Sequence, residues 1–138
     1  MNKIKRWFRR KYILYRYKHN YNSGKLIYLK SSDRQLGLTT ELIKESVNKN
    51  IPILVHNNIA RRHIVHEMYK MGQLSLIPSV TEEYAMDNLV ITPLTNIRGR
   101  GIKWILVDNG CTELDVVKLL DDYPVAILNG YITSYLMA

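Results

Sequence analysis

The sequence predicts an α/β fold in which a parallel sheet lies between two layers of helices. Short, continuous apolar runs occur at residues 51–55 and 102–108. Such runs are typical of strands that are buried on both faces, as in parallel sheets. Segments with helical spacing of apolar residues separate these runs, and this alternation favours parallel pairing through crossover connections. The chain has 138 residues, a length typical of one such domain.

The individual elements follow from apolar spacing and from capping and turn residues. Asn57 or Asn58 is expected to cap one helix, and Thr112 with Asp115 resembles a capping box for another. The predicted helices cover residues 2–19, 39–49, 59–71 and 112–122, with a helical turn at 81–83. The predicted strands cover residues 25–30, 51–55, 74–77, 89–92, 102–108 and 125–128, followed by a turn at Asn129-Gly130 and a last strand or helix at 131–137.

The positive charge of the chain is concentrated at its N-terminus. The formal net charge is +8, from 20 lysines and arginines against 12 acidic residues. Residues 1–20 contain eight of the basic residues and no acid, so the remainder of the chain is neutral. We therefore divide the chain into a basic amphipathic helix at 1–20 and an α/β domain at 21–138, with a short linker near 20–24. An acidic partner is expected at the N-terminus.

The remaining composition predicts a cytoplasmic protein. Cys111 is the single cysteine, which excludes an internal disulfide and fits a reducing compartment. We expect it to be a small buried thiol. No apolar run is long enough to cross a membrane, and the basic N-terminus lacks the apolar segment of a secretory signal.

The segment after the first strand, residues 31–40, has the spacing of a phosphate-binding loop. That motif is Gly, four residues, Gly, Lys, then Ser or Thr, and it binds phosphate through backbone N–H groups and the start of the next helix. In this chain Leu38 stands at the lysine position. The strand at 102–108 ends in a carboxylate that could support a magnesium ion. The candidate phosphate-binding residues are Ser32, Arg34, Gly37, Thr39, Thr40 and Asp108.

Two substitutions predict that this site is vestigial and that no residue is catalytic. Leu38 removes the cation that would neutralise the terminal phosphates, and charge-assisted hydrogen bonds of this kind contribute about 1.5–3 kcal/mol each. Asn109 stands where an ATPase carries a catalytic glutamate, and an amide cannot accept a proton from the attacking water.

These motifs resemble the ATPase core of phage large terminases, which drive DNA packaging. Ser-Asp-Arg-Gln-Leu-Gly-Leu-Thr-Thr at 32–40 is similar to the family's adenosine-binding loop, and Leu-Val-His at 54–56 to its second strand. The Arg-Gly segment at 97–101, leading into 102–108, resembles its Arg-Gly loop and Asp-Glu strand. The resemblance covers residues 25–128 and departs from the family at Leu38, Asn109 and an inserted Asp33. It implies a three-layer P-loop-like fold and a phage origin.

The resemblance and the two losses together predict a non-catalytic, phage-type pseudo-ATPase in the cytoplasm of a host cell. It is expected to act by binding nucleic acid or a host nucleoprotein complex, and inhibition of a host defence nuclease is one form of that activity. The alternative is a weak ATPase that uses Arg34, Thr39 and Asp108, or a nucleotide-sequestering protein. No cofactor is expected for the leading hypothesis, whereas the alternative requires ATP and Mg²⁺.

Four hypotheses remain open for the N-terminal helix. Helical geometry places Ile4, Phe8, Tyr12 and Tyr15 on one face and most of the cations on the other. In the first hypothesis the helix binds nucleic acid, and in the second it docks on an acidic protein. In the third it lies on an anionic membrane, and in the fourth its aromatic face packs on the domain and leaves a solvated basic face. The candidate partner-binding residues are Lys3, Lys5, Arg6, Trp7, Arg9, Arg10, Lys11, Arg16 and Lys18, together with Arg98 and Arg100 in a later loop.

Metal binding is not expected. His63, His66 and Glu67 lie close together on one predicted helix. A structural zinc site needs four ligands, often cysteines, and the sequence places no further ligand nearby.

Overall fold

The structure, a computed structural model, describes residues 2–20, 25–33 and 36–133. It is an α/β protein with a five-stranded sheet in the order β1-β5-β4-β2-β3. All neighbouring strands are parallel, so the predicted class, a parallel sheet with helices on both faces, is confirmed. The strands are β1 (Ile27–Leu29), β2 (Ile53–Leu54), β3 (Val90–Ile91), β4 (Trp104–Val107) and β5 (Ala126–Thr133).

The ends of the helices follow local capping chemistry. Asn57 accepts a hydrogen bond from the Ala60 N–H at 2.9 Å, and Thr112 and Asp115 form the predicted capping box. No helix within the described ranges is long and apolar enough to cross a membrane. The helices are α1 (Lys3–His19), the 3₁₀ turn η1 (Ser31–Asp33), α2 (Thr39–Lys49), α3 (Asn58–Gln73), α4 (Glu82–Tyr84) with the π-helical turn η2 (Ala85–Leu89), and α5 (Glu113–Asp122).

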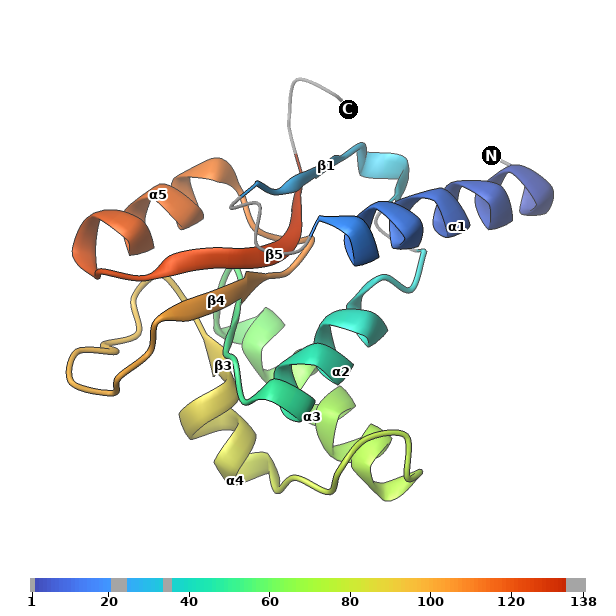
Figure 1. The fold of residues 1–138 in the computed structure, drawn as a ribbon. Coiled ribbons are helices and arrows are strands. Elements are labelled where there is room, and N and C mark those ends of the chain that lie inside the picture. The colour runs from blue at the N-terminus through green and yellow to red at the C-terminus, as the bar shows by residue number, and fades with distance from the viewer. Residues whose placement is uncertain (1, 21–24, 34–35, 134–138) are drawn as a thin grey trace.

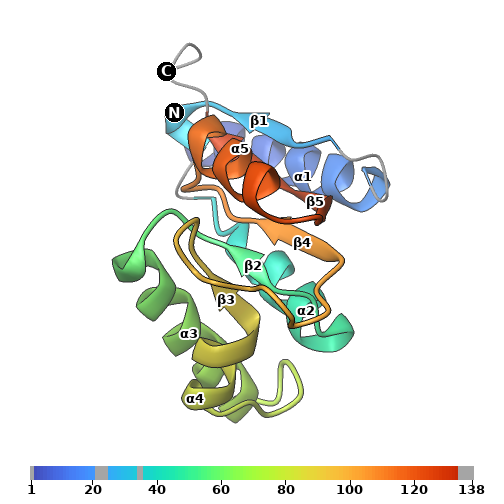
Figure 2. The same ribbon diagram turned by 90° about the vertical axis from the view of Figure 1, so that its left-hand side faces the viewer.

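Each face of the sheet carries its own apolar core, because successive side chains of a strand point to opposite faces. In β4, Leu106 packs in a core with α1, α2 and α3. Its neighbours Ile105 and Val107 pack in a second core with α5. Figure 1 shows α1 and α2 on one side of the sheet, and Figure 2, turned by 90°, shows α5 in front of the sheet and α1 behind it.

The parallel arrangement gives the sheet two chemically distinct edges. The carboxyl ends of all strands meet at one edge, which holds the loop after β1 and the segment 108–112 after β4. The amino ends meet at the other edge, which holds residues 50–52 before β2 and residues 97–103 before β4. Open parallel sheets bind ligands at their carboxyl edge, and the predicted phosphate site lies there.

The turn predicted at Asn129-Gly130 is wrong, because both residues lie inside β5. The register between β4 and β5 shifts at this point, so Leu106 pairs with Asn129 and not with the next residue in step. The buried Asn129 side chain donates to the Tyr17 carbonyl in α1 at 2.8 Å. The Asn-Gly sequence, which usually forms hairpin turns, lies here inside a central strand. Its asparagine side chain attaches the N-terminal helix to that strand.

The strand predicted at 74–77 is also wrong. Helix α3 continues to Gln73, and the chain then turns through Ser75, whose φ is +59°. The Leu76 N–H donates to the Met71 carbonyl at 3.0 Å, which satisfies one of the last carbonyls of the helix. The apolar side chains at 74 and 76 are exposed and do not belong to a sheet.

Gly130→Ala tests the close approach of β5 to β4. At Gly130 φ is +146°, and a Cβ there would lie 2.5 Å from the Val107 carbonyl oxygen. We expect this substitution to lower the free energy of unfolding by about 3 kcal/mol or more, because the backbone of β4 cannot move aside. Gly99→Ala is the matched control, since φ is also positive there (+80°) but the space is open. It should cost about 1–2 kcal/mol. Equal losses in urea unfolding would contradict the close approach.

Candidate functional site

The carboxyl edge brings together two residues that the sequence placed in one phosphate site. Thr39 begins α2, and Asp108 directly follows β4. The Thr39 hydroxyl donates to the Asp108 carboxylate at 3.2 Å, although β5 lies between β1 and β4 in the sheet. The hydroxyl and the carboxylate that would share a magnesium ion therefore face one another.

The loop after β1 is organised around a buried carboxylate. Asp33 is fully buried, accepts the Lys30 N–H at 3.0 Å and closes the turn η1. Arg9 of α1 donates to both of its oxygens, through Nε and Nη2, each at 3.0 Å. This fork-to-fork geometry is the strongest form of an arginine–carboxylate pair. The inserted aspartate is thus a structural group inside the loop.

The pKa of Asp33 lies below its ordinary value. Burial opposes ionisation, but the hydrogen bonds from Arg9 and from the Lys30 N–H, with the positive charges of both residues, outweigh it. The pKa of Arg9 is raised in turn by its hydrogen bond to Asp33. The pair is therefore charged at neutral pH and holds α1 against the loop.

A second arginine of α1 also binds the loop. Arg10 Nε donates to the Leu36 carbonyl at 2.9 Å, and Ile13 and Tyr17 from the same side of α1 are buried in the core. The side of α1 that carries Arg9 and Arg10 therefore lies on the domain. The hypothesis that the face with Ile4, Phe8, Tyr12 and Tyr15 packs there is wrong, because these four side chains are exposed. Ile13, Tyr17 and two paired arginines fill the interface instead.

The remaining loop residues are placed as follows. Gly37 has φ +71°, a left-handed conformation that favours glycine. Leu38 is only 1% exposed and packs in the core beneath the loop, so its side chain does not occupy the place of a phosphate-binding lysine. Ser32 is exposed, and Thr40 is half-buried in the first turn of α2. Arg34 lies outside the described residues.

Asp108 is buried, and burial disfavours the charged form of its carboxyl group. Burial raises the pKa of Asp108, although the Asn109 N–H, the Thr39 hydroxyl and the Gly110 N–H all favour the ionised form. The Asn109 carbonyl accepts a hydrogen bond from the Thr133 hydroxyl at 2.5 Å, which ties this segment to β5. This contact is made by the backbone of Asn109, so it does not depend on which side chain stands at the position of the ATPase base.

The described part of this edge does not fit a magnesium–triphosphate group. Thr39 and Asp108 are suitable for the metal, but the lysine is replaced by the buried Leu38. The loop also contains its own anion, Asp33, which is already neutralised by Arg9. The residues described by the structure include no group of three or more His, Cys, Asp or Glu that could hold a metal ion.

One pair of side chains at this edge, a histidine and an aspartate, was not predicted from the sequence. His56, which follows β2, lies 2.7 Å from an Asp115 oxygen through its Nδ1. The same oxygen accepts the Thr112 N–H at 2.9 Å, so the capping box of α5 also orients the imidazole. The signal in the sequence was that His56 directly follows the predicted strand at 51–55, while Asp115 lies in the first turn of the helix predicted after the strand at 102–108. Cys111 is buried below them, as expected, with its Sγ 3.2 Å from the Leu54 carbonyl oxygen.

The opposite side of α1 presents four exposed aromatic rings and one exposed isoleucine, a surface that we call the outward aromatic face. It comprises Ile4, Trp7, Phe8, Tyr12 and Tyr15, whose side chains are 53–69% exposed. Cations lie among the rings: Lys11 Nζ is 5.5 Å from the centre of the Trp7 ring, and the Arg16 guanidinium is 5.9 Å from that of Tyr12. Exposed cations also flank this face, at Lys3, Lys5, Lys11, Arg16 and Lys18. Arg6 is half-buried.

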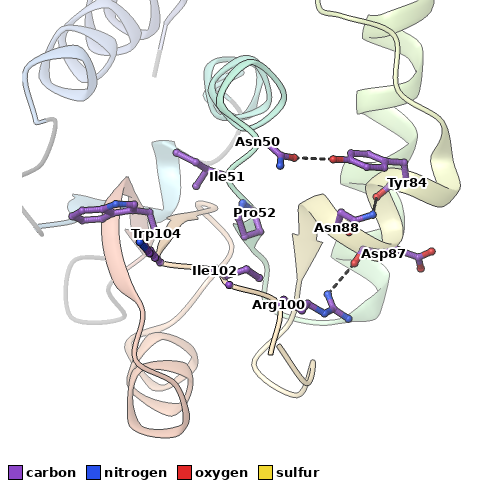
Figure 3. Close-up of a pocket in the computed structure, with 11 residues that line it drawn as sticks. Asn50, Ile51, Pro52, Tyr84, Asp87, Asn88, Arg100, Ile102 and Trp104 are labelled. Carbon is purple, nitrogen blue, oxygen red and sulfur yellow. Dashed lines mark hydrogen bonds between the residues drawn. The ribbon is translucent and has the colours of Figure 1, made fainter. Parts of the chain in front are cut away.

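Arg98 and Arg100 do not join either of these surfaces. They precede β4 and therefore lie at the amino edge of the sheet. Arg100 lines a groove there with Pro52 and Trp104, as Figure 3 shows. Arg98 borders a separate hollow beside Tyr123. The Arg-Gly loop is thus separated from Thr39 and Asp108 by the length of the strands.

Comparisons of this chain with models of known protein families, with curated proteins and with solved structures find no match. The class of the protein is therefore defined by its own fold, an all-parallel five-stranded sheet flanked by helices.

The Arg9–Asp33 pair predicts a stability that depends on acid pH. Asp33→Asn should lower the free energy of unfolding by about 1–3 kcal/mol at pH 7, because Arg9 then faces a neutral group. Because the pKa of Asp33 is lower in the folded protein, its carboxylate stabilises the fold at pH values above the ordinary pKa of 3.8. This stabilisation is lost as the pH falls from 3.8 through the lower pKa of the folded state. The difference between wild type and variant in urea unfolding should therefore shrink below pH 4.

Glu67→Gln provides the control for this experiment, since Glu67 pairs with Lys70 at 3.8 Å on the surface. It should change stability by less than about 0.5 kcal/mol. A difference between wild type and Asp33→Asn that stays constant from pH 7 to pH 3 would show that the carboxylate charge contributes nothing.

Leu38→Lys tests whether the lysine position has become part of the core. The substitution places a charge where the side chain is buried, so it should lower the free energy of unfolding by several kcal/mol. Leu38→Met, which conserves volume, should cost less than about 1.5 kcal/mol. We further expect the double variant Leu38→Lys, Asn109→Glu not to gain thermal stability from MgATP. A folded double variant that is stabilised by MgATP would show that the phosphate cradle is intact.

Proposed function

We propose that this protein is a non-catalytic, P-loop-like protein that binds single-stranded nucleic acid through the outward aromatic face of α1. The observation that carries this proposal is the exposure of four aromatic rings among lysines and arginines on one helix that contains no acid. Proteins that bind single strands combine a cationic track for the phosphates with rings on which the bases stack. We extend the proposal to the nucleoprotein complexes of a phage-infected cell, in line with the terminase resemblance.

The non-catalytic part of the proposal is supported by the carboxyl edge. The contact between Thr39 and Asp108 and the parallel topology are compatible with descent from a P-loop NTPase. The buried Leu38 and the Arg9–Asp33 pair both oppose triphosphate binding, since one removes a cation and the other fills the loop with a neutralised carboxylate. An arginine of α1 thus stabilises the loop internally and leaves the outer side of the helix for a partner.

Nucleic acid fits the outward aromatic face better than a membrane does. A helix that inserts into a bilayer surface presents an aliphatic and aromatic face and keeps its cations on the other side. Here the other side is covered by the domain, and the exposed face mixes cations with rings. Tyr15 stacks on His19, with ring centroids 4.2 Å apart. A nucleic-acid base would stack on these rings in the same way.

The retained Thr39–Asp108 contact favours a second function, weak nucleotide binding with or without ATP turnover. A thermal-shift panel with ATP, ADP and GTP in the presence of Mg²⁺ separates the two functions. A ligand at a hundred times its dissociation constant adds about 2.7 kcal/mol of stability. No gain is expected from the unmodified protein, and a gain would support the second function.

Removal of three of the four exposed rings should strongly weaken nucleic-acid binding. Binding of a fluorescein-labelled single-stranded oligonucleotide is measured by anisotropy for wild type and for the Trp7→Ala, Tyr12→Ala, Tyr15→Ala variant. Each stacked base contributes about 1–3 kcal/mol, so the variant should lose at least about a hundredfold in affinity. Wild-type affinity should also fall with salt, with a logarithmic slope of about −0.7 for every phosphate contacted.

Tyr28→Ala is the matched control, because Tyr28 is exposed on β1 and points away from the face that α1 covers. It should bind as wild type does. Unchanged affinity in the triple variant, or an affinity that is insensitive to salt, would overturn the proposal. Binding to anionic vesicles without binding to the oligonucleotide would favour the membrane hypothesis in its place.

A further inference from the structure

A groove of about 660 Å³ opens at the amino edge of the sheet, away from α1 and from the carboxyl edge. The segments that lead into β2 and β4 contribute most of its lining. Asn50, with φ +56°, ends α2 and turns the chain into β2, while Gly101, with φ +70°, turns the chain toward β4. The turns α4 and η2 close the far wall. The volume lies in the range of small-molecule sites.

The groove carries three kinds of group. Trp104 and Tyr84 are each 43% exposed and lie on opposite sides of it in Figure 3, with Pro52 and Ile102 between them. Asn50 and Asn88 supply amides, and Arg100 and Lys103 supply positive charge. The one acid of the lining, Asp87, directs its carboxylate away from Ile102 in Figure 3. The groove therefore offers a ligand aromatic rings, side-chain amides and positive charge.

The lining is held in place before any ligand arrives. The Tyr84 hydroxyl donates to Asn50 Oδ1 at 2.9 Å, which links the two walls. Arg100 Nη1 donates to the Asp87 carbonyl at 2.9 Å, and Asn88 Nδ2 donates to the Tyr84 carbonyl at 3.2 Å. A site that is already ordered loses less conformational entropy on binding.

We infer that this groove binds a nucleotide. A nucleotide combines a flat base, which stacks on an indole or a phenol, with base-edge groups, which pair with amides. Its phosphate carries the negative charge that arginine and lysine bind. These are the three kinds of group that line the groove. The base lies against Trp104 and the phosphate at Arg100 and Lys103. This site is independent of the proposed function of α1.

The fluorescence of Trp104 tests the inference directly. The chain has two tryptophans, so Trp7→Phe leaves Trp104 as the single reporter. This protein is titrated with AMP, GMP, CMP and UMP, and with inorganic phosphate and adenosine as partial ligands. We expect saturable quenching by at least one nucleotide, with weaker binding of the partial ligands. No saturable change with any nucleotide at millimolar concentration would overturn the inference.

Arg98 and Arg100 provide a matched pair on one loop. In the Trp7→Phe background, Arg100→Gln should weaken the nucleotide at least about tenfold, which is the loss of one charge-assisted hydrogen bond. Arg98→Gln, with the same change of charge outside the groove, should bind as its parent does. Equal weakening by both variants would show a general charge effect and overturn the inference. Lys103→Gln, at an exposed position, replaces Arg100→Gln if that variant does not fold.

Two further arms separate this site from other sources of binding. Tyr12→Ala with Tyr15→Ala in the same background should leave nucleotide quenching unchanged, whatever happens to oligonucleotide binding by α1. Loss of quenching in this variant would place the ligand on α1 and overturn the inference. If a short oligonucleotide saturates the quenching of Trp104 fluorescence at a lower concentration than AMP does, the ligand is a nucleic-acid strand. The reverse order identifies a free nucleotide.

Discussion

The buried ion pair between Arg9 of α1 and Asp33 of the loop after β1 is a central contact between the N-terminal helix and the rest of the domain. Asp33 is charged although it is fully buried, and the two hydrogen bonds from Arg9 compensate for the loss of hydration. In return, the pair fixes α1 about its own axis. Ile13 then reaches the core. The rings on the other side of the helix have no surface of the domain to cover and are exposed.

The parallel sheet distributes the chemistry of the molecule over separate surfaces. Its carboxyl edge brings Thr39 and Asp108 together, while in the neighbouring loop Leu38 is buried in the core and the Asp33 carboxylate is paired with Arg9. Its amino edge holds the groove around Trp104. The outward aromatic face of α1 belongs to neither edge. The two proposed binding surfaces therefore act without contact between them, and each can be altered while the other is kept.

The sequence predicted the fold class because burial on both faces leaves a simple pattern, as in the apolar residues before Asp108. It also paired Thr39 with Asp108, since both follow strands of one parallel sheet. Asn129 misled the prediction, because its role depends on α1, more than a hundred residues away in the chain. Arg9 and Asp33 were found separately but not as partners, since their contact joins two elements whose relative position no local pattern encodes. The orientation of α1 was unpredictable for the same reason.

The attachment of α1 to β5 has a mechanical consequence. Near its C-terminal end the helix is held by the buried Asn129 amide and by the stacking of Tyr17 on Tyr131, whose ring centroids lie 5.3 Å apart. Arg9 and Arg10 hold its middle. The inner side of α1 is thus attached to the domain both at the middle of the helix and near its C-terminal end. A partner that binds the outer side of α1 must therefore adjust its own conformation to the helix. A flexible polymer can do this more readily than a second folded domain.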